Sequence, residues 1–444
     1  MSSTVVETEA SEPRAENEIQ SKEYRKVAWA SFIGTSIEWY DFYLYGSSAA
    51  LIFPALFFPT IDPLYGTIAA FTTYAVGFIA RPLGSAVFGH FGDRVGRRNV
   101  LMLSLLVMGA ATFLIGLLPT HQSIGIGAPL LLSLLRLIQG FAVGGEWGAA
   151  VVMTVEHAPP GKRGFYGSFP QLGVPVGLLL STLVFSLFSN QLSEEAFLAW
   201  GWRLPFLLSA VLVLIGVYVR WKLSESPVYL KQRAEQPQVD THPVRTVWRE
   251  EKKPLLLTIG MKLLQNALFY IYSVFLLSYL AETLQMDSSV GLNAIMISSV
   301  VGLITLPLWS YASDRIGRKP VYLFGVIASM LFIFPFFWLV DTGSVLWITI
   351  GVVLGLNILH DAIYGPQAVY YSELFGTQVR LSGASIGYQI GAVLSGGLSP
   401  IIASSLLAGF HGESWPIAIY LTVLGVLSLI ATLFARETYR DSLT

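Results

Sequence analysis

Several ionisable side chains lie inside stretches of the chain that are otherwise apolar. Glu38 and Asp41 are three residues apart in the first of these stretches, so both carboxylates share one face of a helix. Such a pair must find a cation, share a proton or face water, because an uncompensated charge is costly inside a bilayer. The fourth apolar stretch offers a cation, Arg136, near the depth of Asp41, and Glu146 lies two to three turns further in. These four residues are the candidates for proton binding and release.

Further polar residues lie at similar depths. Arg81 falls in the inner half of the second stretch, and Lys262 and Asp361, in the second half of the chain, are placed so that they could pair. His360 could titrate near neutral pH, although a hydrogen-bonded packing role is the alternative. Static ion pairs that fix helix register are the alternative for Arg81 and Glu146. The expected substrate-binding residues are Tyr40, Arg81, Arg136, Gln171, Lys262, Asn266, Asn357, His360, Asp361 and Tyr388.

Other kinds of chemistry find no support in the sequence. The chain has no cysteine, which removes disulfides, thiolate metal sites, iron–sulfur clusters and cysteine nucleophiles together. No metal cluster or nucleophile motif is evident, so we predict no metal, no cofactor and no enzymatic activity. The formal net charge of −1 produces no global field that would attract nucleic acid.

The elements that must position these residues are transmembrane helices. Of 444 residues, 54% are hydrophobic and 12% are charged, so the chain is predicted to be an all-α polytopic membrane protein. Twelve stretches are long enough to span a bilayer: 27–53, 65–88, 99–118, 128–153, 164–188, 203–221, 254–280, 289–311, 320–340, 345–371, 381–405 and 414–435. We divide the chain into a disordered cytoplasmic tail (1–26), a six-helix bundle (27–221), a central loop (222–253), a second six-helix bundle (254–436) and a short tail (437–444).

Lysine and arginine residues give an independent test of this layout. Nearly all of them fall in loops on one side of the expected membrane, whereas the loops on the other side carry mostly acidic residues. Because cytoplasmic loops are enriched in lysine and arginine, we expect both termini and the central loop to be cytoplasmic. The expected location is the plasma membrane, with lipid as the surrounding solvent.

One loop pattern occurs twice. The stretch 89–98 reads GHFGDRVGRR, and 310–319 reads SYASDRIGRK, each between two expected helices. Both copies resemble the loop signature of the major facilitator superfamily, which implies two six-helix repeats with a substrate site between them. The resemblance assigns a gate role to the residues of these loops: Gly89, Asp93, Arg94, Gly96, Arg97, Arg98, Asp314, Arg315, Gly317 and Arg318. A solvated basic loop that only sets topology is the alternative.

Several segments are similar to one branch of that superfamily, the metabolite:proton symporters. They are 38–42 (EWYDF), 78–84, 136–148, 202–206 (WRLPF) and the 373–385 region with Glu373 and Arg380. Asn357 followed by His360-Asp361 is similar to the shikimate transporters within the branch. The resemblance implies import of an organic acid or a zwitterionic osmolyte with protons. Osmosensing members carry a long C-terminal coiled coil, and its lack here argues against an osmosensor.

The function expected from these observations is a proton-coupled symporter for a small carboxylate, such as a shikimate-like acid, that works as a monomer by alternating access. Asp41, then Glu38 or Glu146, would carry the proton, and substrate near Arg136 or Arg81 would retune that carboxylate. A proton-coupled transporter of a zwitterion or another metabolite is the first alternative. A nutrient receptor that signals without transport is the second.

Overall fold

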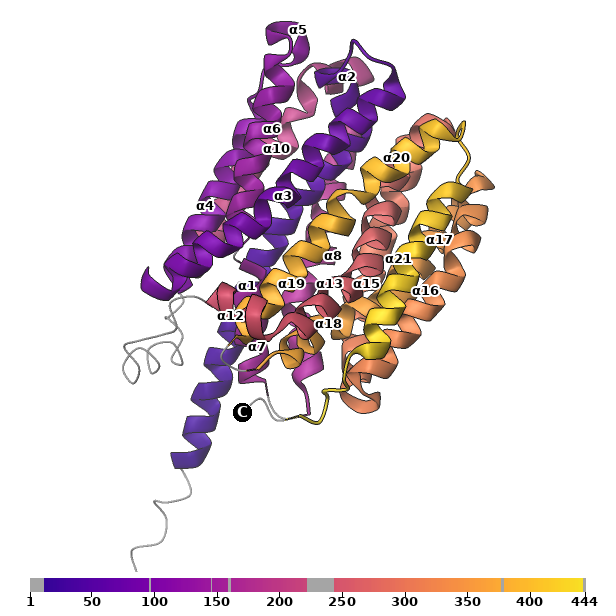
Figure 1. The fold of residues 1–444 in the computed structure, drawn as a ribbon. Coiled ribbons are helices and arrows are strands. Elements are labelled where there is room, and N and C mark those ends of the chain that lie inside the picture. The colour runs from indigo at the N-terminus through magenta and orange to yellow at the C-terminus, as the bar shows by residue number, and fades with distance from the viewer. Residues whose placement is uncertain are drawn as a thin grey trace, which may run out of the picture.

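The computed structural model describes residues 12–95, 97–144, 146–158, 161–221, 243–376 and 379–441. Side chains are described from residue 29 onward, except those of 89–101, 243–245 and a few single positions. All regular structure in these ranges is helical, and the helices stand in two adjacent groups (Figure 1). The first group is built from residues 12–221 and the second from 243–434, so each group comes from one half of the chain.

The first group contains the long helices α1 (Glu12–Leu51), α3 (Pro63–Val95), α4 (Arg97–Gly116), α6 (Gly127–Val143), α7 (Glu146–His157), α8 (Arg163–Gln191) and α10 (Arg203–Trp221). α7 follows α6 directly and completes one membrane-length rod with it. The short elements α2 (Phe53–Phe57), α5 (His121–Ile124), α9 (Glu194–Ala196) and the π-helical η1 (Phe197–Gly201) join the long helices.

The second group begins with α12 (Pro243–Glu250) and α13 (Lys252–Tyr270), and α13 continues through η2 (Ile271–Phe275), α14 (Leu276–Ser278) and η3 (Tyr279–Thr283). The next helices are α15 (Ser288–Ile316) and α16 (Arg318–Asp341). One continuous span then consists of α17 (Val345–Val353), η4 (Leu354–His360) and α18 (Asp361–Leu374), and the next consists of α19 (Arg380–Ala392), η5 (Val393–Gly397) and α20 (Ser399–Gly409). The last helix is α21 (Trp415–Phe434).

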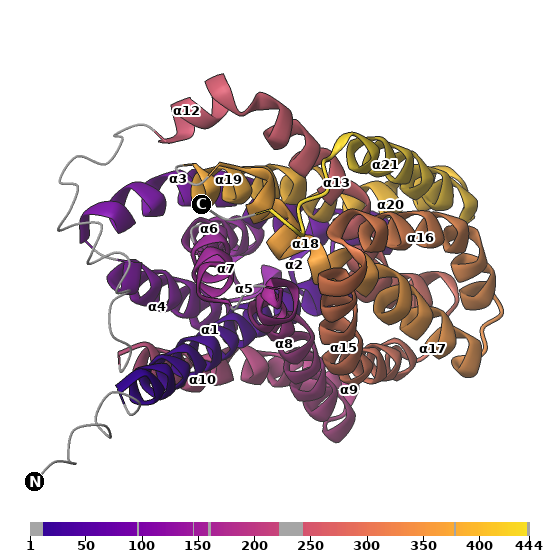
Figure 2. The same cartoon turned by 90° about the horizontal axis from the view of Figure 1, so that it is seen from below.

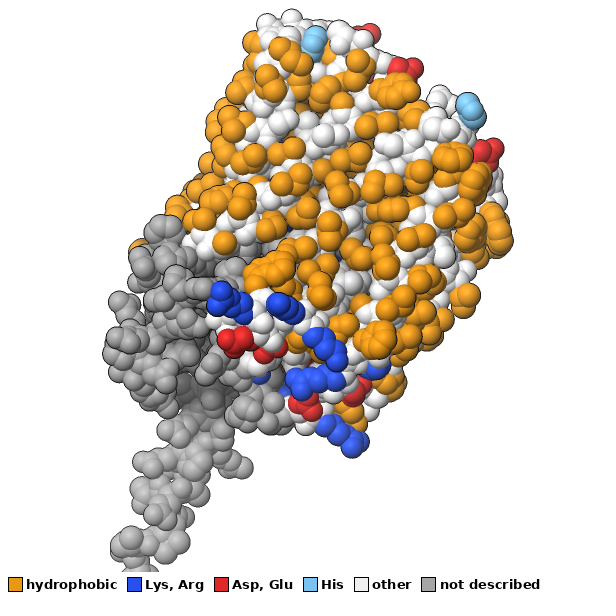
Figure 3. Space-filling model, viewed as in Figure 1, with side chains coloured by type: hydrophobic (Ala, Val, Ile, Leu, Met, Phe, Trp, Pro, Cys, Tyr) orange, Lys and Arg blue, Asp and Glu red, His pale blue; other side chains and the backbone are white. Residues whose placement is uncertain are grey.

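The helices have the length and surface of membrane spans. Nine described helices are long and apolar enough to cross a bilayer, and the bent pair Glu194–Gly201 and Arg203–Val219 would make a tenth. The other two expected spans correspond to α1 and to the shorter apolar helix Met102–Gly116. Apolar side chains cover the flank seen in Figure 3, and the described charges gather at its ends. We call the end with Arg315, Lys319 and Arg436 the basic end, and the end with Asp62, Glu282 and Asp341 the acidic end.

Two segments differ from the sequence expectations. α1 begins at Glu12, so residues 12–26 are helical where a disordered tail was expected. The segment is rich in Ala, Glu, Gln, Lys and Arg, which are good helix formers, and Pro13 occupies the first turn, where proline is tolerated. Within the expected central loop, residues 243–250 form α12, and residues 222–242 lie outside the described residues.

The two groups pack together through a small number of helices. α8 packs along α15, and α3 packs against α19, η5 and α20, as the view along the helices also shows (Figure 2). Aromatic rings fill the middle of this interface: Phe42 and Phe78 contact Tyr270, and Tyr43 contacts Phe269. The largest cluster of buried hydrophobic residues therefore includes both halves of the chain.

Small residues allow the closest helix approaches. A Cβ on Gly140 would lie 1.9 Å from the carbonyl oxygen of Gly77, so α6 and α3 touch backbone to backbone there. On α19, a Cβ on Gly391 would lie 2.6 Å from the Cβ of Lys262. The small-residue spacing of α19 therefore makes room for a lysine of α13.

Candidate transport site

Two neighbouring cavities lie at the interface of the helix groups. The larger is lined by α8, α15 and the η4–α18 segment, including Asn357, His360 and Asp361. The smaller is lined by Trp39 and Tyr43 of α1 and by α13 residues that include Lys262. Val174, Phe269 and Tyr364 line both cavities and separate them.

Lys262 is completely buried at the smaller cavity. Its ammonium group donates hydrogen bonds to the side-chain oxygens of Gln265, at 2.6 Å, and Gln367, at 3.1 Å. It also lies 3.7 Å from the ring centre of Tyr388, which gives it a cation–π contact. The charge is thus held by neutral groups and is available to an anion in the cavity.

A hydrogen-bonded chain runs from Lys262 to Asp361. Gln265 Nε2 lies 2.6 Å from His360 Nε2, and His360 Nδ1 lies 3.3 Å from Asp361. Asp361 also accepts hydrogen bonds from Thr305, at 2.6 Å, and from Asn357, at 3.5 Å. The pairing expected between Lys262 and Asp361 therefore takes place through Gln265 and His360.

The local backbone explains how this chain forms. Residues 354–360 make π-helical turns, which insert extra residues and rotate the side chains that follow. Asn357 and His360 both belong to these turns, and Asp361 begins α18 directly after them. The Ser298 hydroxyl of α15 holds Asn357 through a hydrogen bond of 2.8 Å to its side-chain oxygen.

Arg81 and Arg136 form a second cationic region in the first helix group. Each guanidinium lies over the ring of Phe42, at 4.3 Å from the ring centre for Arg81 and 4.2 Å for Arg136. Both side chains are buried, and the Nε and Nη2 atoms of each have no hydrogen-bond partner. Unpartnered buried guanidinium donors are well suited to bind a carboxylate.

Asp41 and Arg136 are linked indirectly. Arg136 donates to the side-chain oxygen of Gln139, Gln139 donates to the Thr112 hydroxyl at 2.8 Å, and Thr112 donates to Asp41 at 2.9 Å. Asp41 is completely buried, and its other carboxylate oxygen has no hydrogen-bond partner. The arrangement connects the expected proton carrier to a cation without a direct contact between them.

The remaining proton candidates are buried nearby. Glu38 is on α1, one turn before Asp41, and Glu146 begins α7. Glu146 accepts a hydrogen bond of 3.4 Å from Ser104 of α4. No group of three or more His, Asp or Glu residues in the described part of the chain could hold a metal ion.

Other residues close the interface around the cavities. Trp147 of α7 stacks on Tyr388 of α19 with ring centres 3.7 Å apart. Gln171 of α8 donates hydrogen bonds to the carbonyl oxygens of Tyr364 and Gly365, so it holds α18 rather than lining a cavity. Tyr40 donates to the Pro205 carbonyl of α10 inside the first group, whereas its neighbours Trp39 and Tyr43 face the smaller cavity.

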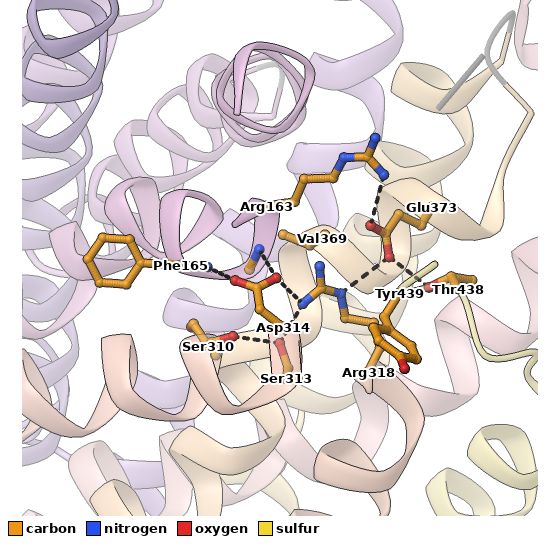
Figure 4. Close-up of polar contacts among 12 residues, drawn as sticks. Arg163, Phe165, Ser310, Ser313, Asp314, Arg318, Val369, Glu373, Thr438 and Tyr439 are labelled. Atoms are coloured by element: carbon orange, nitrogen blue, oxygen red, sulfur yellow. Dashed lines mark hydrogen bonds and ion pairs between the residues drawn. The ribbon is translucent and has the colours of Figure 1, made fainter. Parts of the chain in front are cut away.

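The basic end is closed by a contact between the groups (Figure 4). Asp314, near the end of α15, accepts 2.8 Å hydrogen bonds from the backbone N–H groups of Gly164 and Phe165, which begin α8. The free N–H groups at a helix N-terminus favour an anion. Arg318 pairs with Asp314 at 2.7 Å and with Glu373 at 3.3 Å. We call Asp314, Arg318 and Glu373 the basic-end latch.

The other gate candidates are less fully described. Gly317 has a φ of 118°, which lets the chain turn from α15 into α16, and Arg315 is exposed. In the first copy of the loop, the side chains of Asp93, Arg94, Arg97 and Arg98 lie outside the described residues, as does Gly96; Gly89 is described only as part of α3.

The acidic end is also closed. The Thr67 hydroxyl of α3 donates a hydrogen bond to Glu282 at the end of η3, which joins the two groups. Within the second group, Asp341 accepts hydrogen bonds from Tyr279, at 2.6 Å, and Ser414, at 2.9 Å. A contact between the two helix groups is therefore present at each end.

The expected substrate-binding residues did not include several residues that line the site. Trp39 and Tyr43 are a helical turn apart and face the same cavity. Gln265, which the sequence places near Lys262 in depth, is the link between Lys262 and His360. Asn266 lines the smaller cavity as expected and donates to the Ala392 carbonyl.

Known proteins are similar to this chain in sequence and in fold. The family model for the Major Facilitator Superfamily matches residues 31–400. The Shikimate transporter of Escherichia coli K12 is 41% identical over 441 residues, covering 99% of this chain and 100% of the relative. The Proline/betaine transporter of the same organism is 34% identical over 432 residues, covering 95% of this chain and 85% of the relative.

Solved structures give the same architecture. The proton:xylose symporter XylE bound to 6-bromo-6-deoxy-D-glucose superposes with a TM-score of 0.73 at 17% identity, covering 96% of this chain and 98% of that chain. A partially occluded inward-open conformation of XylE from E. coli superposes equally well, with a TM-score of 0.73. The predicted fold of twelve transmembrane helices in two repeats is thereby confirmed.

Proposed function

The chain belongs to the Major Facilitator Superfamily and is a multi-pass membrane transporter, and on this premise we propose that it carries a small organic acid across the membrane together with protons. One observation carries the proposal. Arg81, Arg136 and Lys262 are buried cations at or beside the aromatic interface of the two helix groups, and among the described residues the Nε and Nη2 atoms of both arginines have no hydrogen-bond partner. The carboxylate of an anionic substrate would accept hydrogen bonds from such donors.

A shikimate-like acid fits the rest of the lining. Shikimate combines one carboxylate with a hydroxylated ring, and such a ring needs several polar partners. The two cavities offer the side chains of Asn266, Asn357 and Ser298, together with tyrosine hydroxyls. The relative that is 41% identical along the whole chain carries the name of this compound, which supports the same substrate class.

Proton coupling would use Asp41. Asp41 is connected to Arg136 through Gln139 and Thr112. A substrate carboxylate near Arg136 would compete for this cation, so Asp41 would gain affinity for a proton as substrate binds. Glu38 and Glu146 are the next candidates for the carrier.

Alternating access would use the two closures as gates. The basic-end latch and the Thr67–Glu282 contact each join the two helix groups, so opening one while the other holds exposes the cavities to one side. We assign the basic end, both termini and the central loop to the cytoplasmic face of the plasma membrane. The transporter would act as a monomer in the lipid bilayer.

A zwitterionic osmolyte is the second candidate substrate. Trp39, Tyr43, Phe269 and Tyr270 surround the smaller cavity, and aromatic rings bind quaternary ammonium groups. The proline/betaine relatives support this class. Lys262 opposes it, because its ammonium lies at the same cavity and would repel a second cation.

Uptake into proteoliposomes separates the candidates. Vesicles with an acidic exterior should accumulate labelled shikimate, and a protonophore should abolish accumulation while counterflow continues. Accumulation of betaine or proline in place of shikimate would transfer the assignment to the second candidate. Accumulation that needs sodium and survives the protonophore would contradict proton coupling.

A further inference from the structure

We propose that the side-chain amide of Gln265 couples the binding of a carboxylate at Lys262 to protonation of His360, by reversing its orientation when the carboxylate arrives. The inference deepens the proposed function and rests on it, because it requires an anionic substrate. Gln265 would be a positioning residue, and His360 would be a second proton site in addition to Asp41. Both residues belong to the second helix group, whereas Asp41 belongs to the first.

The orientation of the Gln265 amide follows from its two neighbours, Lys262 and His360. The Lys262 ammonium can only donate, so the Gln265 oxygen must face it, at 2.6 Å. The Gln265 nitrogen then faces His360 Nε2, also at 2.6 Å, and can only donate to it. His360 Nε2 is therefore an acceptor, which leaves the ring proton on Nδ1, where it faces Asp361 at 3.3 Å.

This arrangement excludes a proton on His360 Nε2. If His360 Nε2 carried a proton, two donors would face each other across 2.6 Å unless Gln265 turned over. A reversed Gln265 would point its N–H groups at Lys262, which also has only donors. While Lys262 has no anion beside it, the orientation of Gln265 therefore disfavours a proton on His360 Nε2.

A bound carboxylate removes this obstacle. It can accept hydrogen bonds from Lys262 and from the N–H groups of a reversed Gln265 at the same time. The Gln265 oxygen then faces His360 Nε2, which can take a proton from the water of whichever side is open. Carboxylate and proton thus favour each other's binding, and this coupling is reciprocal.

Charge balance leads to the same result. In the hydrogen-bonded series from Lys262 to Asp361, Lys262 carries one positive charge and Asp361 carries one negative charge. The positive charge of Arg81, in the first helix group, repels that of Lys262. The residues of α8 and α15 at the larger cavity are uncharged, and Tyr364 and Phe269 pack against His360. A monoanion adds one negative charge, and one proton on His360 offsets it. One proton per carboxylate is the expected stoichiometry at this site.

Gln367 provides a matched control. Its oxygen accepts from the same ammonium at 3.1 Å, but its nitrogen donates to the hydroxyls of Tyr322 and Tyr371. Replacing it also removes an amide that holds Lys262, without touching His360. Gln265→Met and Gln367→Met therefore each remove one acceptor from Lys262. The first also removes the contact to His360, and the second also removes the contacts to Tyr322 and Tyr371.

The first test measures shikimate binding to the full-length protein in detergent at pH 5.5 to 8. For the wild type, the Kd should rise with pH, by up to about tenfold per unit for each linked proton. Gln265→Met should remove the share of this slope that comes from His360, whereas Gln367→Met should weaken binding at every pH and keep the slope. A wild-type slope in Gln265→Met would overturn the inference, because Asp41 or another group would then account for it.

The second test needs no substrate. NMR of the ¹⁵N-histidine-labelled protein at pH 8, assigned with His360→Gln, should find the neutral His360 ring protonated on Nδ1. A ring protonated on Nε2 would overturn the inference whether or not shikimate binds. If the Nδ1 form is found but the wild type binds no shikimate or other carboxylate, the proposed function is wrong, and the coupling inference falls with it. If the protein binds a carboxylate but the His360 ring is protonated on Nε2, the proposed function is supported and the coupling through Gln265 is wrong.

Discussion

Asp314 of α15 accepts a 2.8 Å hydrogen bond from the backbone N–H of Gly164, in the first turn of α8, so a carboxylate of one helix group caps a helix of the other. The contact extends to Phe165 and is reinforced by Arg318, which pairs with Asp314 and Glu373. The contact at the basic end therefore depends on ionic groups at a helix terminus.

Asp314→Asn should weaken this closure. The amide keeps one acceptor oxygen but loses the charge that pairs with Arg318, at a cost of about 1–3 kcal/mol, enough to shift a population several-fold or more. Transport should slow while substrate affinity stays within a few-fold. Single cysteines on the two sides of the cavities should show more labelling from the basic end, and the native chain has no cysteine to interfere.

Arg315→Gln is the matched control for that experiment, because Arg315 is exposed one residue from Asp314. Labelling should not change in Arg315→Gln.

In the first copy of the loop, the glycines at 89 and 92 predict closer packing than Ser310 and Ser313 allow, so Asp93→Asn should have a larger effect on transport than Asp314→Asn. Transport lost in either mutant with unchanged labelling would indicate misfolding instead of a gate.

Asp41→Asn should abolish uphill accumulation more severely than binding. The amide fixes a neutral form at the position of the proposed proton carrier and can still accept the hydrogen bond from Thr112. Counterflow without a pH gradient should persist. Asp62→Asn, at an exposed position of the acidic end, serves as the control and should accumulate normally. Wild-type accumulation by Asp41→Asn would move the carrier to Glu38 or Glu146.

Arg81→Gln should weaken carboxylate binding. Its guanidinium is buried over Phe42, and its Nε and Nη2 atoms have no hydrogen-bond partner among the described residues, so the mutation removes donors that we propose bind the substrate carboxylate. The loss of a hydrogen bond to a charged group predicts a Kd increase on the order of 10- to 100-fold. Thermal shift with shikimate reports the change. The control is Arg249→Gln, at an exposed position, which should bind shikimate as the wild type does. If Arg81→Gln also binds with wild-type affinity, Arg81 has a structural role and does not bind the substrate.

Thr67→Val should loosen the acidic end. Valine keeps the shape of threonine but cannot donate to Glu282. Cysteine labelling from the acidic end should increase, the opposite direction to Asp314→Asn. Thr72→Val changes the same residue type on the same helix, where the hydroxyl bonds only to the carbonyl of Ile68, and should leave labelling unchanged. Equal labelling in both mutants would show that Thr67 does not hold the gate.

Gly140→Ala should destabilise the first helix group. The added Cβ would lie 1.9 Å from the Gly77 carbonyl oxygen, so α3 and α6 must separate, with an expected cost of about 1–3 kcal/mol. The melting temperature should fall. Gly127→Ala adds the same group to α6, where its nearest neighbour is a side-chain atom 3.5 Å away, and should be tolerated. Matching melting temperatures would mean that the helices shift at little cost.

The sequence by itself determined the membrane class, the repeated loop and the depth at which ionisable residues lie. These properties depend on composition and on spacing along the chain, so apolar stretches, basic loops and the positions of Asp41, Arg136 and Lys262 within their helices could be predicted. The start of α1 at Glu12 was missed, because a polar segment without an apolar face was expected to be disordered.

Only the tertiary structure decided which side chains meet. The rotation of each helix about its axis depends on packing with its neighbours, and it directs Tyr40 toward α10 while Trp39 and Tyr43 face a cavity. The π-helical turns before Asp361 change the side-chain register, which periodicity cannot reveal, and they bring His360 to Gln265. Asp314 caps a helix 149 to 150 residues away in the chain, a contact that exists only once the two groups have docked.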